Sequence, residues 1–122
     1  MQHIGDSAFS ACKFTDIVIP NSVKTIGKDA FYACSKFKSL ELGSGVTDIG
    51  HDAFYLCDSL EKVVIKDSLI SIGNQAFCSC SNLKSIEFTG TRRQWFMIKK
   101  SSGWNDENTD YIQCTDGQVL FN

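Results

Sequence analysis

Apolar residues recur along the chain with a period of 22 to 23 positions, and their local spacing changes within each period. Part of each period alternates apolar and polar residues with a spacing of two, which is typical of a short, half-buried strand. The alternation predicts four equivalent strands, at DIVI (16–19), SLEL (39–42), KVVI (62–65) and SIEF (85–88).

Side chains alternate between the two faces of a strand, so each of these stretches has an inward and an outward set. Pairs such as Leu40 and Leu42 are expected to point into the core. The residues between them are expected to face solvent and to line up in columns across the repeats. These candidate surface residues are Asp16, Val18, Ser39, Glu41, Lys62, Val64, Ser85 and Glu87.

The rest of each period carries a second pattern, I-G-x-x-A-F-x-x-C. The spacing around Val46 and Ile49 predicts a second, weaker extended piece, and the glycine that follows suits a tight corner. A single helical turn is expected next, in segments such as HDAFYLC (51–57), because one turn packed through its Phe on a neighbouring coil would be stable. The repeat closes on Cys12, Cys34, Cys57 and Cys80.

A unit of 23 residues cannot bury its own apolar side chains, so the units must stack as the coils of a solenoid. Adjacent strands lie about 4.8 Å apart, and equivalent side chains therefore form ladders through the interior. The four repeat cysteines would be one such ladder beside a ladder of Phe side chains. Because a buried cysteine behaves as a small hydrophobe, we expect this ladder to be reduced and structural.

The repeat resembles the BspA-like, or Treponema pallidum type, leucine-rich repeats, with the pattern L-x-x-I-x-I-P-x-x-V-x-x-I-G-x-x-A-F-x-x-C. FTDIVIPNSVKTIGKDAFYAC (14–34) matches nearly every position, although the proline after the strand survives only as Pro20. The resemblance implies an α/β solenoid, a leucine-rich-repeat stack of right-handed coils. Its repeats of 22 to 23 residues would combine short parallel strands with one-turn helices, and a helical cap would close the C-terminus.

The two ends of the array differ. Residues 1–90 would hold four repeats, the first incomplete, and residues 91–122 a cap. Within the cap, TGTRRQWFMIKK (89–100) predicts a short amphipathic helix with Thr91 as N-cap. The aromatic and apolar residues expected to cover the last coil are Trp95, Trp104, Tyr111 and Ile112.

Met1 falls inside a repeat, so we expect the natural protein to be longer than this chain. Without a preceding coil, Ile4, Phe9 and Ile17 would leave an apolar strand edge open. Such an edge favours end-to-end self-association through the N-terminal coil.

The composition and charge of the chain argue against several classes of function. With 43% apolar residues, including nine Phe, the chain can form one continuous core. A net charge of -2 and a pI near 5.6 give no basic field for nucleic acid. Apolar runs of only a few residues argue against membrane insertion, and Met1 does not begin a secretion signal.

A packing role for the cysteines is better supported by the sequence than a catalytic or metal-binding role. His51 precedes Cys57 by six residues, but the equivalent coils do not repeat a histidine there. Cys78 and Cys80 form a single C-x-C without a second pair, and Cys114 lies in the cap. We therefore predict no catalytic residue, no metal and no cofactor. The basic group Arg92, Arg93, Lys99 and Lys100 is more simply a solvated face of the cap helix than an anion site.

A solenoid turns one strand per repeat toward an extended concave surface whose outward residues are free to vary, which favours a non-catalytic protein-binding module. The family resemblance implies a surface-exposed or secreted protein that adheres to host or matrix proteins. The first alternative is a structural spacer that displays a missing N-terminal domain. The second, which is less favoured, is a carbohydrate-binding face. A sugar site would need exposed aromatic residues on the strands, and the outward positions hold none.

Overall fold

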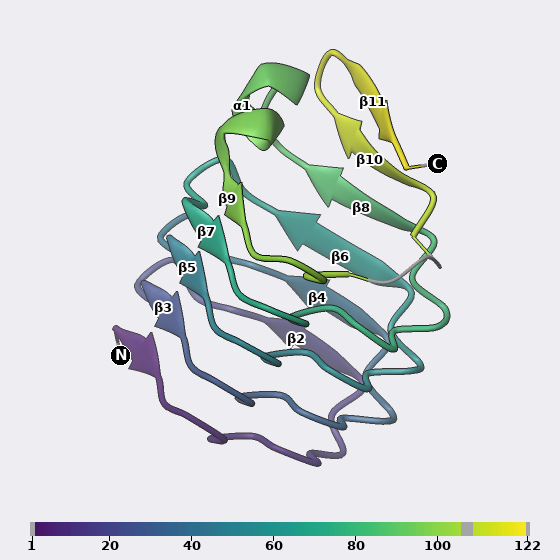
Figure 1. Cartoon of the computed structure of the whole chain (residues 1–122). Coiled ribbons are helices and arrows are strands. Elements are labelled where there is room, and N and C mark those ends of the chain that lie inside the picture. Colours follow the sequence, from purple (N-terminus) through teal and green to yellow (C-terminus); the bar gives the residue numbers. More distant parts are fainter. Residues whose placement is uncertain (1, 106–108, 122) are drawn as a thin grey trace.

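A computed structural model describes residues 2–105 and 109–121 of the chain, which winds into a stack of coils (Figure 1). Its single described helix and its strands are short. In chain order the elements are β1 His3–Ile4, β2 Asp16–Val18, β3 Thr25–Ile26, β4 Ser39–Glu41, β5 Asp48–Ile49, β6 Lys62–Ile65, β7 Ser71–Ile72, β8 Ser85–Phe88, α1 Arg92–Met97, β9 Lys99–Lys100, β10 Tyr111–Cys114 and β11 Gly117–Leu120.

The strands form two sheets on different sides of the stack (Figure 1). One sheet has five strands in the order β1-β3-β5-β7-β9, and the other has six in the order β11-β10-β8-β6-β4-β2. All pairs are parallel and join equivalent repeat positions, except that β10 and β11 pair antiparallel. The predicted solenoid is thereby confirmed, and it has about five turns, where the sequence predicted four repeats and a cap.

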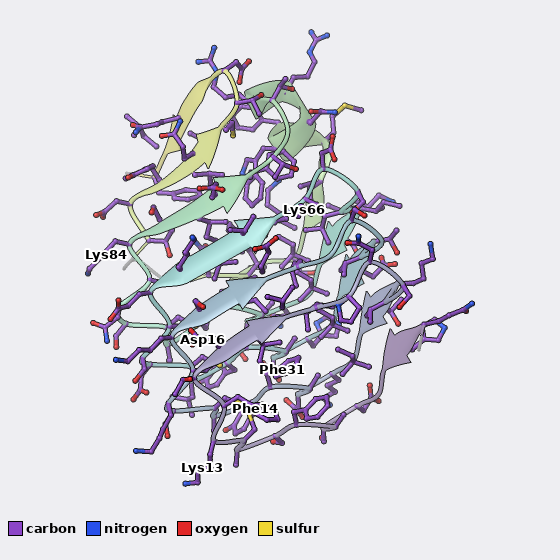
Figure 2. The ribbon with its side chains drawn as sticks, turned by 180° about the vertical axis from the view of Figure 1, so that it is seen from behind. Lys13, Phe14, Asp16, Phe31, Lys66 and Lys84 are labelled. Carbon is purple, nitrogen blue, oxygen red and sulfur yellow. The ribbon has the colours of Figure 1, made fainter. Side chains whose placement is uncertain are left out.

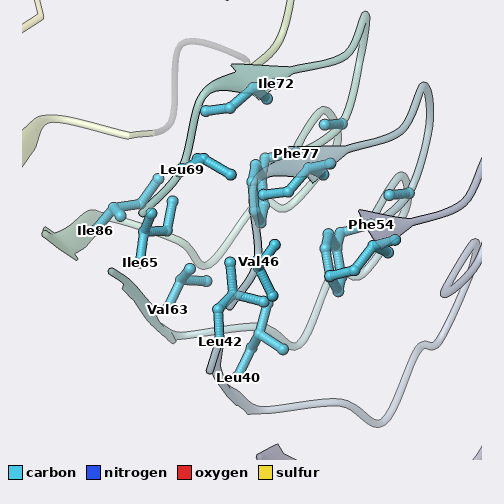
Figure 3. Close-up of a cluster of buried hydrophobic side chains, with 14 of the residues drawn as sticks. Leu40, Leu42, Val46, Phe54, Val63, Ile65, Leu69, Ile72, Phe77 and Ile86 are labelled. Atoms are coloured by element: carbon cyan, nitrogen blue, oxygen red, sulfur yellow. The ribbon is translucent and has the colours of Figure 1, made fainter. Parts of the chain in front are cut away.

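The strands predicted from the two-residue alternation are present as β2, β4, β6 and β8, and the weaker extended pieces as β3, β5 and β7. Inward residues of the larger sheet, such as Leu40 and Val63, are buried. Figure 3 shows these side chains pointing toward the Phe54 and Phe77 rings from the opposite side of the coil. One continuous core therefore runs through the stack.

The predicted one-turn helices are wrong. Residues 27–34 instead form three overlapping turns, in which Ala30, Tyr32 and Cys34 donate their backbone N–H to the carbonyl three residues earlier. The alternate N–H groups of the segment bond to the next coil. Those of Asp29 and Phe31 donate to backbone carbonyls of that coil at 3.0 and 2.8 Å. A helix would keep all of its bonds within the segment, so inter-coil bonding replaces helix formation here.

This zigzag of hydrogen bonds requires left-handed backbone at non-glycine residues. Asp29 and Ala33 both have φ of 58°, and the same two positions are left-handed in the three other complete turn segments. The third position of a type II turn requires such a positive φ. The local sequence therefore adopts a conformation that its own side chains disfavour, because it places every second N–H against the neighbouring coil.

A ladder of stacked Phe rings fills the interior beneath these turns. The rings of Phe31, Phe54 and Phe77 lie 5.1 Å apart and nearly parallel. The coils also approach closely at the Ile-Gly corner, since a Cβ on Gly73 would lie 2.6 Å from the backbone nitrogen of His51. Glycine there is needed for the coil spacing that stacks the rings.

The C-terminal segment is not a helical cap. The predicted helix is present over six residues, with Thr91 as N-cap and with Trp95 and Ile98 buried, but the described residues after it form three strands and no further helix. β9 and β10 extend the two sheets of the solenoid, and β11 turns back to pair with β10. Within the described residues, no helix is long and apolar enough to cross a membrane.

Two tryptophans close this end of the core. The Trp104 ring packs edge-on against Phe77 at 6.3 Å, and Trp95 lies 5.5 Å from Trp104. Ile112 is fully buried, as expected for a residue that covers the last coil.

The N-terminal coil is open at Phe9 and Ile17, as predicted, but the expectation for Ile4 is wrong, because Ile4 is only 5% exposed and pairs with Ile26 in the next coil. Phe9 and Ile17 are only partly buried, whereas their equivalents in the later coils are buried. Phe14 is 47% exposed, although its equivalent Phe37 is completely buried. The first coil thus lacks the cover that each later coil receives from the coil before it.

Candidate protein-binding face

The outward side chains of β2, β4, β6 and β8 form one continuous surface, which we call the outer sheet face (Figure 2). Ladder pairing places the eight candidate residues in two columns, beginning at Asp16 and at Val18. Val18 is 70% exposed, Ser39 and Ser85 are half-buried, and the charged members are exposed. Seven of the eight predicted positions therefore reach solvent.

Val64 is the exception, because it is only 6% exposed. Its partners across the ladder are Glu41 in β4 and Glu87 in β8. Lys66, two residues beyond Val64, binds Glu41 with 3.3 Å between Nζ and Oε2. Val64 thus lies between two longer side chains of the neighbouring strands, and the aliphatic stems of such side chains shield apolar neighbours from water. The prediction that Val64 is exposed to solvent is therefore wrong. Val64 is a buried residue of the outer sheet face.

Hydrogen bonds between coils hold polar groups of this face in place. The Ser39 hydroxyl donates to the Asp16 carboxylate at 2.7 Å, which joins β2 to β4. The Lys66–Glu41 pair joins β4 to the end of β6. Both pairs are partly solvated, so we assign them an effect on side-chain orientation rather than a large contribution to stability.

A depression of about 70 Å³ lies between Val18, Glu41 and Lys62, with Val64 in its lining. Small-molecule sites are usually clefts of about 300 to 1,000 Å³. The depression is thus too small for such a ligand, but a surface of mixed polarity suits contact with a protein.

The ladder cysteines are bonded within the stack. The thiols of Cys34, Cys57 and Cys80 each donate to the carbonyl of the Phe in the preceding coil, at 3.2 Å in every case. All three side chains are buried. This shared geometry agrees with the packing role predicted for the repeat cysteines.

Cys12, at the open end, is partly buried, and its thiol donates to the Cys34 sulfur at 2.8 Å. Burial and this hydrogen bond raise the pKa of Cys12 to about 11. Hydrogen bonding with the Cys57 thiol, together with burial, raises the pKa of Cys34 further. Both groups are therefore protonated at neutral pH, and a protonated thiol is a poor nucleophile.

The structure does not bring His51 and Cys57 together as a reactive pair. His51 is exposed, and its Nδ1 accepts a hydrogen bond from the Asn74 backbone N–H at 2.7 Å. Cys57 is buried against the Phe31 carbonyl. The remaining cysteines lie in the last coils, where the Cys78 thiol donates to the Gly103 carbonyl and Cys114 is buried. Burial, followed by the Asp116 charge, raises the pKa of Cys114.

The basic group of the C-terminal segment is divided between different environments. Arg92 lies 3.6 Å from Asp116, and Arg93 and Lys99 are exposed. Lys100 donates to the Trp95 and Ile98 carbonyls at 2.9 Å each, and burial lowers its pKa. The four residues thus do not form one uniform solvated face, because Lys100 holds the end of α1.

Sequence reasoning missed an aromatic pair on the turn side of the coils. The Tyr32 and Tyr55 rings stack at 5.5 Å, nearly parallel, and both side chains are partly exposed. The signal was available, because the two residues occupy the same repeat position directly after the Phe. The pair lies outside the outer sheet face, whose strands carry no exposed aromatic residue among those described.

Residues 2–102 match the model of the BspA type leucine-rich repeat region, in six copies. No curated protein matches the chain. Among solved structures, a leucine-rich repeat protein of T. pallidum is similar, with a TM-score of 0.78 and 30% identity over 91% of this chain and 51% of its own.

Two further solved structures share the architecture. A leucine-rich cell surface protein of Faecalibacterium prausnitzii A2-165 has a TM-score of 0.64 and 31% identity, over 83% of this chain and 33% of its own. The pneumococcal vaccine antigen PcpA has a TM-score of 0.60 at 19% identity, over 86% of this chain and 31% of its own. The PcpA likeness shows the fold alone. The chain spans about half the length of the T. pallidum protein and about a third of the other two.

Proposed function

Because this chain belongs to the BspA-type leucine-rich repeat family, we propose that it is a non-catalytic protein-binding module that uses its outer sheet face. Repeat proteins of this kind are generally protein-interaction modules. The observation that carries the proposal is the exposed surface of mixed polarity formed by β2, β4, β6 and β8. On it Val18 is 70% exposed beside the exposed Glu41, its partner in the ladder.

The chemistry of the face favours a protein over other partners. Acidic Asp16, Glu41 and Glu87 outnumber Lys62 among the exposed candidate residues, so phosphate backbones would be repelled rather than attracted. Fixed carboxylates beside an exposed valine offer both hydrogen-bond acceptors and apolar area to a partner.

We further propose that the natural protein displays this module at the cell surface or in secreted form, where it adheres to host or matrix proteins. The F. prausnitzii protein of similar fold is described as a cell surface protein, which supports this location. The bonded positions of His51 and Cys57 support a binding role over a catalytic one.

The experiment is a charge change on the face with a matched change elsewhere. Val18→Lys with Glu87→Lys alters two exposed residues of the outer sheet face, whereas Leu56→Lys with Asp58→Lys makes the same chemical change on the turn side. Binding is measured to immobilised collagen, fibronectin and serum proteins, and folding by circular dichroism. We expect the first variant to lose at least tenfold in affinity, because hot-spot changes typically cost about 2 kcal/mol or more.

Full binding by the face variant, with loss in the turn-side variant, would move the site to the turns. A parent chain that binds none of these proteins would favour the spacer alternative. Binding of oligosaccharide arrays in place of proteins would favour the carbohydrate alternative, for which the stacked Tyr32 and Tyr55 are the aromatic side chains at hand.

A further inference from the structure

A groove crosses the outer side of the five-stranded sheet, which is not the sheet that carries the outer sheet face. Its lining includes residues of β3, β5, β7 and β9, which lie side by side along the stack (Figure 1). The groove measures about 650 Å³ and begins at Ile26, so it includes no residue of the first coil. Small-molecule sites are usually clefts of about 300 to 1,000 Å³. The groove therefore has the size of a ligand site, unlike the depression on the outer sheet face.

Two glycines form part of the floor of this groove. Gly50 and Gly73 directly follow β5 and β7, and both line the groove. Because glycine has no side chain, nothing rises from the floor at these positions. Along the third coil, Asp48 comes two positions before Gly50, and His51 comes directly after it. The groove thus has a floor of backbone between the outward residues of the strands and the side chain of His51.

The groove carries opposite charges at its two ends. Asp48 lies in β5, and Lys99 and Lys100 form β9. The Asp48 carboxylate accepts hydrogen bonds from the hydroxyls of Ser71 and Thr47, which fix its orientation. The Lys100 Nζ donates to two carbonyls at the end of α1, which leaves one of its three N–H groups for another acceptor. Neither Asp48 nor Lys99 forms an ion pair with any residue that the structure describes.

The separation of these charges follows from the strand pairing. Asp48 pairs with Ser71, and Ser71 pairs with Lys99, so two strand spacings separate Asp48 from Lys99. Neighbouring strands lie about 4.8 Å apart, which places the two Cα atoms roughly 10 Å apart. An extended peptide advances about 3.3 Å per residue, so roughly three residues cover this length. A tripeptide with free termini therefore carries its ammonium and carboxylate groups at a matching separation.

His51 offers a hydrogen-bond donor between the two charged ends. Its Nδ1 accepts a hydrogen bond from the Asn74 backbone N–H, which places the proton of the neutral ring on Nε2. The ring is exposed and lines the groove. An amide carbonyl of a peptide above Gly50 and Gly73 is a suitable acceptor for this N–H. A phosphate or sulfate group would match Lys99 but would be repelled by Asp48, so the groove favours a ligand with both charges.

We propose that this groove binds a short peptide with free termini, whose ammonium group contacts Asp48 and whose carboxylate contacts Lys99 and Lys100. The peptide lies along the axis of the stack, across β5, β7 and β9. Both end contacts are charge-assisted hydrogen bonds, which are stronger than those between neutral groups. The site shares no residue with the outer sheet face, so it can fail without affecting the proposed protein-binding function.

The first test titrates the parent chain with trialanine and follows the backbone amide NMR signals of Gly50 and Gly73. N-acetyl-trialanine and trialanine amide each lack one terminal charge, and dialanine is too short to reach both ends. We expect saturable shifts with trialanine and at least tenfold weaker binding of each blocked peptide, because each loses a hydrogen bond between charged groups. Absence of shifts at Gly50 and Gly73, or equal binding of the free and blocked peptides, overturns the proposal.

The second test changes one end of the groove at a time. Asp48→Asn keeps the shape of the side chain and removes its charge, so it should weaken trialanine binding at least tenfold and make N-acetylation of the peptide inconsequential. Lys99→Gln should weaken trialanine binding as well. Lys28→Gln makes the same change on the turn side, outside the groove, and should bind like the parent. Circular dichroism checks folding. A folded Asp48→Asn variant that still distinguishes trialanine from its N-acetyl form overturns the proposal.

Discussion

At the scale of the residue, each repeat position has a distinct physical task. The Phe carbonyl of one coil accepts two hydrogen bonds, one from the backbone N–H of its own cysteine and one from the thiol of the next coil, as at Phe31 with Cys34 and Cys57. Cysteine thus packs as a small apolar side chain and satisfies a carbonyl lone pair. Alanine would keep the first property and lose the second.

The Phe ladder should matter more for stability than the thiol ladder. Phe54→Ala removes a completely buried ring that stacks on both Phe31 and Phe77, and such truncations cost about 3 to 5 kcal/mol. Cys57→Ala removes one sulfur and one weak hydrogen bond, for which we expect about 1 to 2 kcal/mol. Urea unfolding of the two variants gives the order directly. Equal losses, or a larger loss for Cys57→Ala, would contradict the core assignment.

Val64 shows where prediction at this scale ends. Alternation along a strand places it outward correctly with respect to the core, and Leu40, Val63 and Ile86 are buried as predicted. Whether an outward side chain is exposed to solvent depends on the size of the neighbouring side chains on other strands. Val64 lies between Glu41 and Glu87 of the neighbouring strands, and a pattern within one strand does not contain that information.

At the scale of the element, the turn segment is the part that departs most from expectation. The existence and place of the strands follow from apolar spacing, but DAFYAC gives no local signal for left-handed backbone at Asp29 and Ala33. Inter-coil hydrogen bonds, such as that from the Ala33 N–H to the Tyr55 carbonyl at 2.7 Å, select this conformation. The β10–β11 hairpin was also missed, although Asp116-Gly117 at its turn is a local hairpin signal, and only the pairing of β10 with β8 joins segments that are distant in the sequence.

Glycine substitutions should therefore act in opposite directions at two alanines of the turns. At Ala33, where φ is 58°, glycine removes a left-handed penalty of about 1 kcal/mol, so Ala33→Gly should be neutral or slightly stabilising. At Ala53, which is completely buried, glycine should cost about 1 to 2 kcal/mol through lost burial and added chain entropy. Thermal unfolding compares the two. Destabilisation by Ala33→Gly equal to that of Ala53→Gly would refute the overlapping-turn description.

At the scale of the whole molecule, the stack has one wide face and two unlike ends. The coils set the columns of the outer sheet face, because parallel ladders place equivalent residues side by side. At the C-terminal end, the Trp95 and Trp104 rings close the core. The division into repeats over 1–90 and a cap over 91–122 stays a prediction, since β9 and β10 continue both sheets beyond residue 90.

The central claim is that partners contact the outer sheet face, and lysine protection in a complex tests it most directly. Lys62 is an exposed residue of that face, whereas Lys28 is exposed on the turn side of the same solenoid. The parent chain is acetylated alone and in complex with the protein that it binds, and modification at each lysine is read by mass spectrometry. We predict that the complex slows acetylation of Lys62 and leaves Lys28 unchanged. Protection of Lys28 with Lys62 fully reactive would contradict the account.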